Sequence, residues 1–183
     1  GGLSGMVMGS VSASVVSHAS CPVVVVREDN HVTDSTKYGP VVVGVDGSEV
    51  SQKATAYAFR EAQARGAALI AVHTWMDMQV QASLAGLSAA QSEWADIEKE
   101  QSELLTENLK EPREEYPEVE VKKLITRDRP VSALTEAAEG AQLLVVGSHG
   151  RGGFKGMLLG STSRALLQSA PCPMMVVRPD EES

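Results

Sequence analysis

Short apolar runs alternate along most of the chain with longer stretches that place apolar residues at helical spacing. The runs at 40–46, 68–75 and 142–147 are mostly apolar and rich in β-branched residues. Such runs are typical of strands that are buried on both faces of a sheet. Residues 119–125 alternate apolar with polar positions, which predicts a partly exposed strand. A last apolar run, at 174–178, predicts the strand that ends the pattern.

Helices are predicted between these strands. Ser48 is a candidate N-cap for a helix over residues 49–65, and Gly66 suits the end of that helix. Pro130 fits the first turn of a shorter helix that ends near Gly140. Each of these helices follows a predicted strand and leads into the next one.

Two further helices are predicted. The stretch at 94–108 repeats mostly apolar residues at helical spacing on an acidic background, and Pro112 and Pro117 are expected to end it. Residues 76–90, before it, are rich in Met, Gln and Ala and show no clear period. The last helix is expected at about 161–169, after a glycine-rich segment.

Strands that alternate with helices predict an α/β fold with a mostly parallel sheet and helices on both faces. Right-handed crossovers leave few possible strand orders. In such sheets a ligand binds beyond the carboxyl ends of the strands, where the strand order reverses. Two segments with unusual chemistry follow strand ends, namely residues 45–48 and the glycine-rich loop at 147–163. If the strands before them are neighbours, both segments face one crevice.

The beginning of the chain repeats its end. Residues 1–27 align without a gap with residues 152–178. The two copies lie about one domain length apart in the sequence. Residues 1–27 are therefore interpreted as the last helix and strand of a preceding module. We then expect a linker at 28–39 and a complete module at 40–179.

The chain is acidic, with 16 Lys and Arg against 24 Asp and Glu and a net charge of −8. This balance argues against a broad nucleic-acid-binding surface. The apolar runs are too short to span a membrane, and the N-terminus shows no secretory signal. Cys21 and Cys172 occupy equivalent positions of the repeat, which indicates a recurring structural slot and favours a reducing, cytoplasmic setting over a disulfide framework.

The loop at 147–163, GSHGRGGFKGMLLGSTS, has the chemistry of an anion-binding loop. Glycines let successive backbone N–H groups point into one concavity, and the following helix N-terminus would add donors and partial positive charge. No Asp or Glu occurs between Gly140 and Pro179. The alternative is a surface loop whose glycines only form turns. The spacing fits neither a P-loop nor the dinucleotide-binding fingerprint.

Four side chains near strand ends are further candidates. Asp46 could accept a hydrogen bond from a ribose hydroxyl or a base amine, or help hold a metal ion; an Asx turn or a helix cap is its alternative role. Thr74 could line an adenine pocket through its backbone, or simply end its strand. His73 is interpreted as a hydrogen-bonded structural residue in preference to a catalytic base. His149 lies inside the loop and could contact phosphate.

Gly147-x-x-Gly150, followed after nine residues by Gly160-Ser161, resembles the ATP-binding signature G-x2-G-x9-G-[S/T] of the universal stress protein family. VGVDGS at the first strand and VHTW at the second add to the resemblance. The resemblance covers residues 40–178 and the repeat at 1–27, and tandem modules of this type are similar to those of actinobacteria.

This resemblance implies a Rossmann-like, five-stranded parallel sheet in the order 3-2-1-4-5, and ATP, with or without Mg²⁺, as the cofactor. Asp46 would bind ribose or phosphate, and Thr74 and Val146 would flank adenine. No catalytic residue and no metal ligand is assigned. The residues expected to bind the nucleotide are Gly44, Val45, Asp46, Ser48, Thr74, Val146, Gly147, His149, Gly150, Arg151, Gly153, Gly160, Ser161 and Thr162.

The first copy of the repeat lacks counterparts of Gly147, Gly150 and Asp46, so one ATP site per chain is expected. Its strand would be an aggregation-prone edge unless paired. The resemblance implies that the last strands of two modules pair. We therefore expect self-association of Val23–Val26 with Met174–Val177, most simply within one chain, with pairing between two chains as the competing arrangement.

The preferred functional interpretation is an ATP-binding stress-response protein in which the nucleotide acts as a regulatory switch and turnover is slow or absent. The alternatives are a slow ATPase or nucleotidyl-transferring enzyme of the same fold, and a nucleotide-free dimerisation module. No carboxylate pair, metal-ligand cluster or activated nucleophile accompanies the loop, which disfavours an enzyme. Adenine nucleotide is the expected partner, with neither nucleic acid nor membrane.

Overall fold

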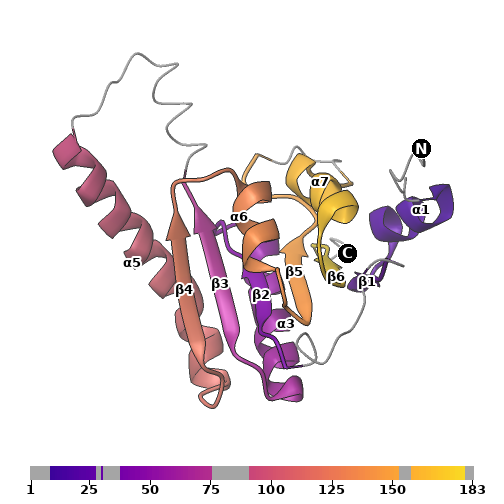
Figure 1. Cartoon of the computed structure of the whole chain (residues 1–183), viewed down its shortest axis with the longest axis horizontal. Coiled ribbons are helices and arrows are strands. Elements are labelled where there is room, and N and C mark those ends of the chain that lie inside the picture. The colour runs from indigo at the N-terminus through magenta and orange to yellow at the C-terminus, as the bar shows by residue number, and fades with distance from the viewer. Residues whose placement is uncertain (1–8, 28–29, 31–37, 76–90, 153–157, 180–183) are drawn as a thin grey trace.

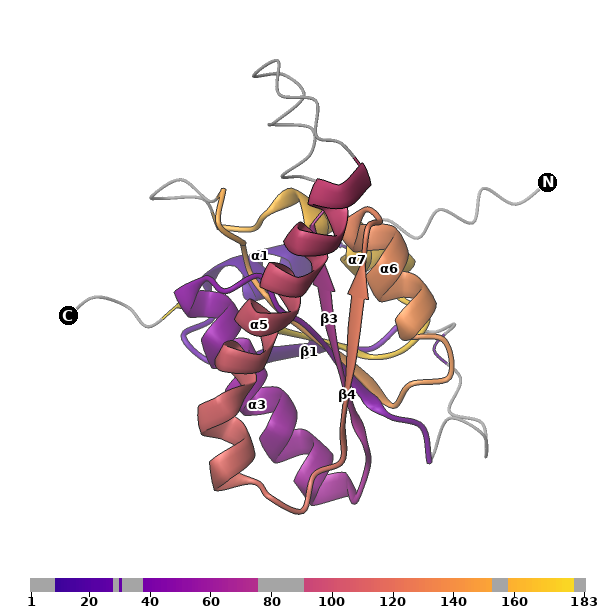
Figure 2. The ribbon, with the colours of Figure 1, turned by 90° about the vertical axis from the view of Figure 1, so that its left-hand side faces the viewer.

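A computed structural model describes residues 9–27, 30, 38–75, 91–152 and 158–179. These residues form one six-stranded sheet with helices on both faces (Figures 1 and 2). None of the described helices is long and apolar enough to cross a membrane. The elements are, in chain order, α1 (Ser10–His18), β1 (Val23–Val25), β2 (Val41–Gly44), α3 (Glu49–Arg65), β3 (Leu69–Thr74), α5 (Gln91–Glu115), β4 (Val121–Thr126), α6 (Pro130–Ala137), β5 (Leu143–Gly147), α7 (Ser161–Ser169) and β6 (Met174–Val177).

The sheet has the strand order β1-β6-β5-β2-β3-β4. The strands β2 to β6 are parallel to one another, and counted from β2 their order is 3-2-1-4-5, as predicted. β1 adds a sixth strand that runs antiparallel to β6. The predicted five-stranded parallel sheet is therefore extended into a mixed sheet, because β1 covers the edge that β6 would otherwise present to solvent.

β1 pairs with β6 of the same chain. This is the simpler of the two predicted arrangements, the other being pairing between two chains. Val24 lies opposite Met175, with Val23 opposite Val176 and Val25 opposite Met174. Val26 was expected in this strand but lies just beyond its end. The sequence pattern therefore identified the partner strands correctly, while the strand itself is one residue shorter.

The sheet separates two layers of hydrophobic core. On one face, α6 and α7 cover Val42 and Leu144, and Val16 of α1 joins the same cluster. On the other face, α3 and α5 cover Val41 and Val145. Figure 2 shows α3 and α5 on one side of the strands and α6 on the other. Because both faces of the sheet are buried, the sequences of β2 and β5 are continuous apolar runs.

Local signals define both ends of α3. The Ser48 hydroxyl accepts a hydrogen bond from the Ser51 N–H at 3.2 Å, which satisfies one of the unpaired donors of the first turn. Gly66 ends the helix in the left-handed conformation, with φ 60° and ψ 34°. Both assignments agree with the sequence prediction.

Pro112 and Pro117 were expected to end α5, and the helix continues past Pro112 to Glu115 and ends before Pro117. Proline removes one backbone donor, but this proline lies in the last turn, where few hydrogen bonds depend on it. The Tyr116 N–H still donates to the Pro112 carbonyl at 2.9 Å. Leu105 and Leu109 are fully buried and hold the helix on the sheet, so packing outweighs the missing bond.

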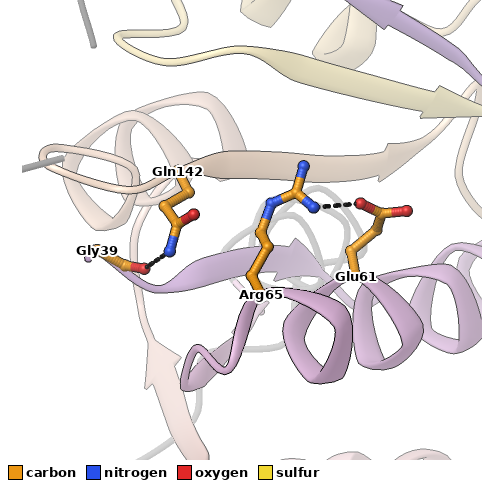
Figure 3. A network of polar contacts seen from close by, with 4 residues as sticks. All are labelled: Gly39, Glu61, Arg65 and Gln142. Carbon is orange, nitrogen blue, oxygen red and sulfur yellow. Dashed lines mark hydrogen bonds and ion pairs between the residues drawn. The ribbon is translucent and has the colours of Figure 1, made fainter. Parts of the chain in front are cut away.

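The start of β2 is fixed against β5 by a tight backbone approach. The Gln142 side-chain amide donates to the Gly39 carbonyl at 2.8 Å, as Figure 3 shows beside the Arg65–Glu61 ion pair of α3. The Gln142 backbone N–H also donates to the Pro40 carbonyl at 2.9 Å. A Cβ atom at Gly39 would collide with the Gly140 carbonyl oxygen, so this position has no room for any side chain.

We expect Gly39→Ala to lower the free energy of unfolding by about 3 kcal/mol, because the backbone of the two strand starts must separate to admit a methyl group. Urea denaturation measures the change. The matched control is Gly152→Ala, whose Cβ would meet nothing within 4 Å. The control should stay within about 0.5 kcal/mol of the parent chain. Equal stability of the two variants would contradict the close approach.

Candidate functional site

The candidate site lies where the strand order reverses, at the carboxyl ends of β2 and β5. The two strands are parallel neighbours, with Val41 opposite Leu143 and Val43 opposite Val145. The chain leaves both strands at the same edge of the sheet, at Gly44 and Gly147. The backbone N–H of Arg151 donates to Asp46 Oδ2 at 3.1 Å. The two segments singled out in the sequence therefore meet.

The Asp46 carboxylate is held from both sides. Its Oδ1 accepts from the Ser48 N–H at 2.9 Å and from the Ser48 hydroxyl at 2.7 Å, while Oδ2 accepts from Arg151. The Asp46 N–H donates to the Ser51 hydroxyl at 3.0 Å. The Asx turn given as the alternative role of Asp46 is thus present. Three of about four lone-pair positions are occupied, which leaves room for one further donor.

Glycine permits this contact at two positions. A Cβ atom at Gly150 would collide with Asp46 Oδ2, so any larger residue would push the loop and the carboxylate apart. Gly47 has φ 79°, and a Cβ there would lie 2.7 Å from an Arg151 guanidinium nitrogen. Both glycines let the two loops approach more closely than side chains would allow.

The beginning and end of the glycine-rich loop are tied together beneath the site. The Gly160 N–H donates to the Ser148 carbonyl at 2.6 Å, and the Ser163 hydroxyl donates to the Gly147 carbonyl at 2.7 Å. The Ser148 N–H donates to the Val177 carbonyl at 2.7 Å. These bonds hold the N-terminus of α7 close to the end of β5, at the edge of the sheet that carries Asp46.

Gly160 is the N-cap of α7 and has no side chain with which to cap the helix. The N–H groups of the first turn are therefore left to acceptors from outside the helix. Ser161 is exposed and Thr162 is half-buried, so both hydroxyls are near the surface at this helix start. The arrangement suits a bound anion.

The other predicted residues have more restricted roles. The side chains of Val45 and Val146 are buried in the core, so only their backbone groups could contact a ligand. Thr74 ends β3 opposite Thr126. His149 Nδ1 lies 3.1 Å from the Ser148 hydroxyl. Gly153 lies outside the described residues.

His73 is a structural residue, as interpreted from the sequence. Its Nδ1 donates to the Val45 carbonyl at 2.6 Å, and its Nε2 lies 2.9 Å from Oε1 of Gln101 on α5. Both side chains are buried. Because Val45 directly precedes Asp46, this bridge fixes the end of β2 against the long helix.

Sequence reasoning missed several residues that support the site. Gln101, Ser51 and Ser163 are buried and each makes a hydrogen bond described above. Only Gln101 carried a local signal, since it is polar within an otherwise mostly apolar helical stripe. Among the described residues, no three His, Cys, Asp or Glu side chains lie close enough together to hold a metal ion.

The chain is similar in sequence to proteins of one family along nearly its whole length. The model of the Universal stress protein family matches residues 1–27 and 37–178. Universal stress proteins Rv2005c and Rv1996 of Mycobacterium tuberculosis are each 46% identical over 178 residues, which is 97% of this chain. The chain spans 58% and 56% of the lengths of these relatives.

Solved structures share the fold at lower identity. Universal stress protein UspA from Lactobacillus plantarum has a TM-score of 0.57 and 22% identity over 77% of this chain and 98% of that chain. A universal stress protein from Archaeoglobus fulgidus has a TM-score of 0.62 and 23% identity over 96% of this chain and 56% of that one. Another from Archaeoglobus fulgidus, in complex with dAMP, has a TM-score of 0.51 and 20% identity over 76% and 98%.

We expect Gly150→Ala to disrupt the contact between the two loops, because its methyl group would collide with Asp46 Oδ2. The free energy of unfolding should fall by about 1–2 kcal/mol. Hydrogen exchange of the Arg151 amide should accelerate, since this amide loses its acceptor. Gly152→Ala is again the control and should change neither quantity. Identical exchange in both variants would argue against the bond between Arg151 and Asp46.

Proposed function

The chain belongs to the universal stress protein family, and we propose that it is an ATP-binding stress-response protein whose nucleotide acts as a regulatory ligand. One observation carries the proposal. The hydrogen bond between Arg151 and Asp46 brings a carboxylate, a glycine-rich turn and a helix N-terminus to the same edge of the sheet. These are the groups that a nucleoside triphosphate needs for its sugar and its phosphates.

The phosphates fit the loop and the start of α7. Gly160 leaves the first-turn N–H groups to outside acceptors, and Ser161 and Thr162 add hydroxyl donors. The stretch from Gly140 to Pro179 contains no carboxylate, although the chain as a whole carries a charge of −8. A triphosphate at this position would therefore meet donors and partial positive charge without a neighbouring acidic side chain from this segment.

The ribose fits Asp46. With three hydrogen bonds already made, its carboxylate retains about one acceptor position, which suits a single hydroxyl donor. The adenine would lie between Thr74, at the end of β3, and Val146, near the end of β5. Mg²⁺, where it accompanies ATP, would be coordinated mainly by phosphate oxygens and water, as is usual for this ion.

The choice of an adenine nucleotide rests on relatives as well as on the site. The Archaeoglobus fulgidus neighbour was solved with dAMP, so this fold holds an adenine nucleotide in at least that protein. The signature Gly147-x-x-Gly150 with Gly160-Ser161 is the pattern by which this chain resembles ATP-binding members. ATP is accordingly the proposed ligand.

A regulatory role is favoured over fast catalysis by the way the polar groups are used. His73 is buried, and both of its ring nitrogens have partners. Asp46 is engaged by the turn and by the loop. His73 therefore has no free ring nitrogen, and the one acceptor position left on Asp46 is assigned to the ribose, so neither group is placed to activate water. The bound nucleotide would instead stabilise the contact between the two loops.

We expect ATP at a hundred times its Kd to stabilise the chain by about 2.7 kcal/mol, which raises Tm by roughly 5–10 °C at this chain length. Ser161→Asp should lower ATP affinity at least tenfold, because it places a negative charge where phosphate binds. The same substitution should leave the ligand-free chain as stable as before or slightly more stable, since an acidic residue suits a helix N-terminus. Thermal denaturation and titration calorimetry separate the two effects.

The control for this substitution is Gln168→Glu, which adds the same charge to the exposed far end of α7. ATP affinity should change less than twofold in the control. Equal losses of affinity in both variants would indicate a general charge effect, and no response of the parent chain to ATP would reject the proposed site.

We expect bound ATP to persist unhydrolysed over hours under single-turnover conditions. Radiolabelled ATP mixed with excess protein should release phosphate no faster than ATP alone. The Asp46→Ala variant should bind more weakly and show the same background rate. Phosphate release well above background in the parent chain, abolished in Asp46→Ala, would instead identify a slow ATPase.

A further inference from the structure

The buried stripe of α5 contains a polar side chain. Gln101, Leu105 and Leu109 follow one another at helical spacing, and each is only 1% exposed. The two leucines pack in the core cluster on that face of the sheet. A third leucine would complete the stripe, whereas burial of an amide is costly unless the amide is paired. Gln101 therefore has a role that packing alone does not explain.

The partner of Gln101 is the imidazole of His73, near the end of β3. Oε1 of Gln101 lies 2.9 Å from Nε2 of the ring. On the other side of the ring, Nδ1 donates to the Val45 carbonyl at 2.6 Å. We call the Gln101 amide, the His73 imidazole and the Val45 carbonyl the α5 bridge. The α5 bridge joins the long helix to the carboxyl ends of β2 and β3.

The α5 bridge holds the backbone where the pairing of β2 with β3 ends. One residue beyond β2, the Val45 N–H donates to the Val72 carbonyl at 2.8 Å. The carbonyl of Val45 is held by the His73 ring, so both backbone polar groups of this residue are tied to β3. The Asp46 N–H then donates to the Ser51 hydroxyl at 3.0 Å. The place of Asp46 relative to β3 therefore depends on His73.

His73 lies between the two residues that the proposed function assigns to the sugar and the base. Asp46 follows the carbonyl that the ring binds, and Thr74 follows His73 in β3. α5 also approaches the turn after Asp46, since a Cβ atom on Gly47 would lie 3.6 Å from Nδ2 of Asn108. The helix thus reaches the chain before Asp46 through the α5 bridge and the chain after it at Gly47.

We propose that Gln101 and His73 are positioning residues of the nucleotide site, through which bound ATP and the placement of α5 are coupled. The inference rests on the proposed function, because it takes Asp46 and Thr74 as nucleotide-binding groups. ATP that holds these two groups in one geometry also fixes the ring between them, and the ring fixes Gln101. By linkage, a displacement of α5 that weakens ATP binding is resisted by bound ATP to the same extent.

Gln101→Met is the decisive variant, because it keeps the length of the side chain and replaces the amide with a thioether, a weak acceptor. Titration calorimetry should show an ATP affinity at least tenfold lower. In the ligand-free variant, hydrogen exchange of the Ser48 and Arg151 amides, which donate to Asp46, should be at least fivefold faster.

The matched control is Leu109→Val, which loosens buried packing two turns further along the same helix. Urea denaturation gives the stability of both variants, so that a general loss of stability can be recognised. The control should change ATP affinity and the exchange of the Ser48 and Arg151 amides less than twofold.

A double-mutant cycle tests whether the two side chains act as one unit. His73→Phe should weaken ATP binding at least tenfold, because it removes the hydrogen bond to the Val45 carbonyl. Adding Gln101→Met to His73→Phe should weaken binding by less than a further twofold, since the α5 bridge is already broken. Two single effects that multiply in full would show that Gln101 acts independently of His73, and would overturn the proposal.

The parent chain offers a measurement that needs no substitution. The side-chain amide resonances of Gln101 should shift in NMR spectra when ATP is added, although this buried residue lies outside the proposed site. Gln142 is the matched reference, because its amide is also hydrogen-bonded but lies before β5, at the opposite end of the strands from Asp46. Its resonances should stay in place. Equal shifts of both amides, or no shift of Gln101, would overturn the coupling.

Failure of the proposed function and failure of the positioning role give different results. A parent chain that does not respond to ATP would overturn both. A parent chain that binds ATP, with equal affinity and equal amide exchange in Gln101→Met and Leu109→Val, would leave the proposed function in place and overturn the positioning role.

Discussion

The hydrogen bond from the Arg151 N–H to Asp46 depends on one constraint, which is that β2 and β5 are parallel neighbours. Parallel strands end at the same edge of a sheet, so the loops that follow them must share that edge. Between them, Gly47 and Gly150 remove the side chains that would separate the two loops. A carboxylate and a donor-rich loop, 105 positions apart in sequence, are thereby held within one hydrogen bond of each other.

Buried polar groups next to Asp46 also hold this edge of the sheet in place. His73 joins the carbonyl of Val45 to Gln101, and so connects β2, β3 and α5 immediately before Asp46. Buried polar groups are costly unless they are paired, which makes this bridge sensitive to any displacement of α5. The long helix therefore has a role at the site although it supplies no ligand. A change in its position would be transmitted to the residue before Asp46.

Most of the fold could be predicted from the sequence because its signals are local. Ser48 and Gly66 mark the ends of α3, and the apolar runs of β2 and β5 show burial on both faces. The structure departs from the local signals where packing decides. Pro112 remains helical because neighbouring leucines are buried, and β1 ends before Val26. At the site, Asp46 and the loop could be identified, but the contacts of Ser51 and Ser163 depend on tertiary approach and have no sequence signature.

The repeat allows the proposed site to be compared with a second, similar helix start. α1 and α7 share a glycine N-cap, a following serine and nearly the same cap geometry. If a helix N-terminus were sufficient, both would be equivalent anion sites. Only α7 follows a loop that leaves β5 beside β2 and bonds to Asp46. The proposed site therefore depends on adjacent strand ends, to which the helix would contribute donors. A chain with one such strand pair among its described residues is expected to hold one nucleotide, whatever the number of suitable helix starts.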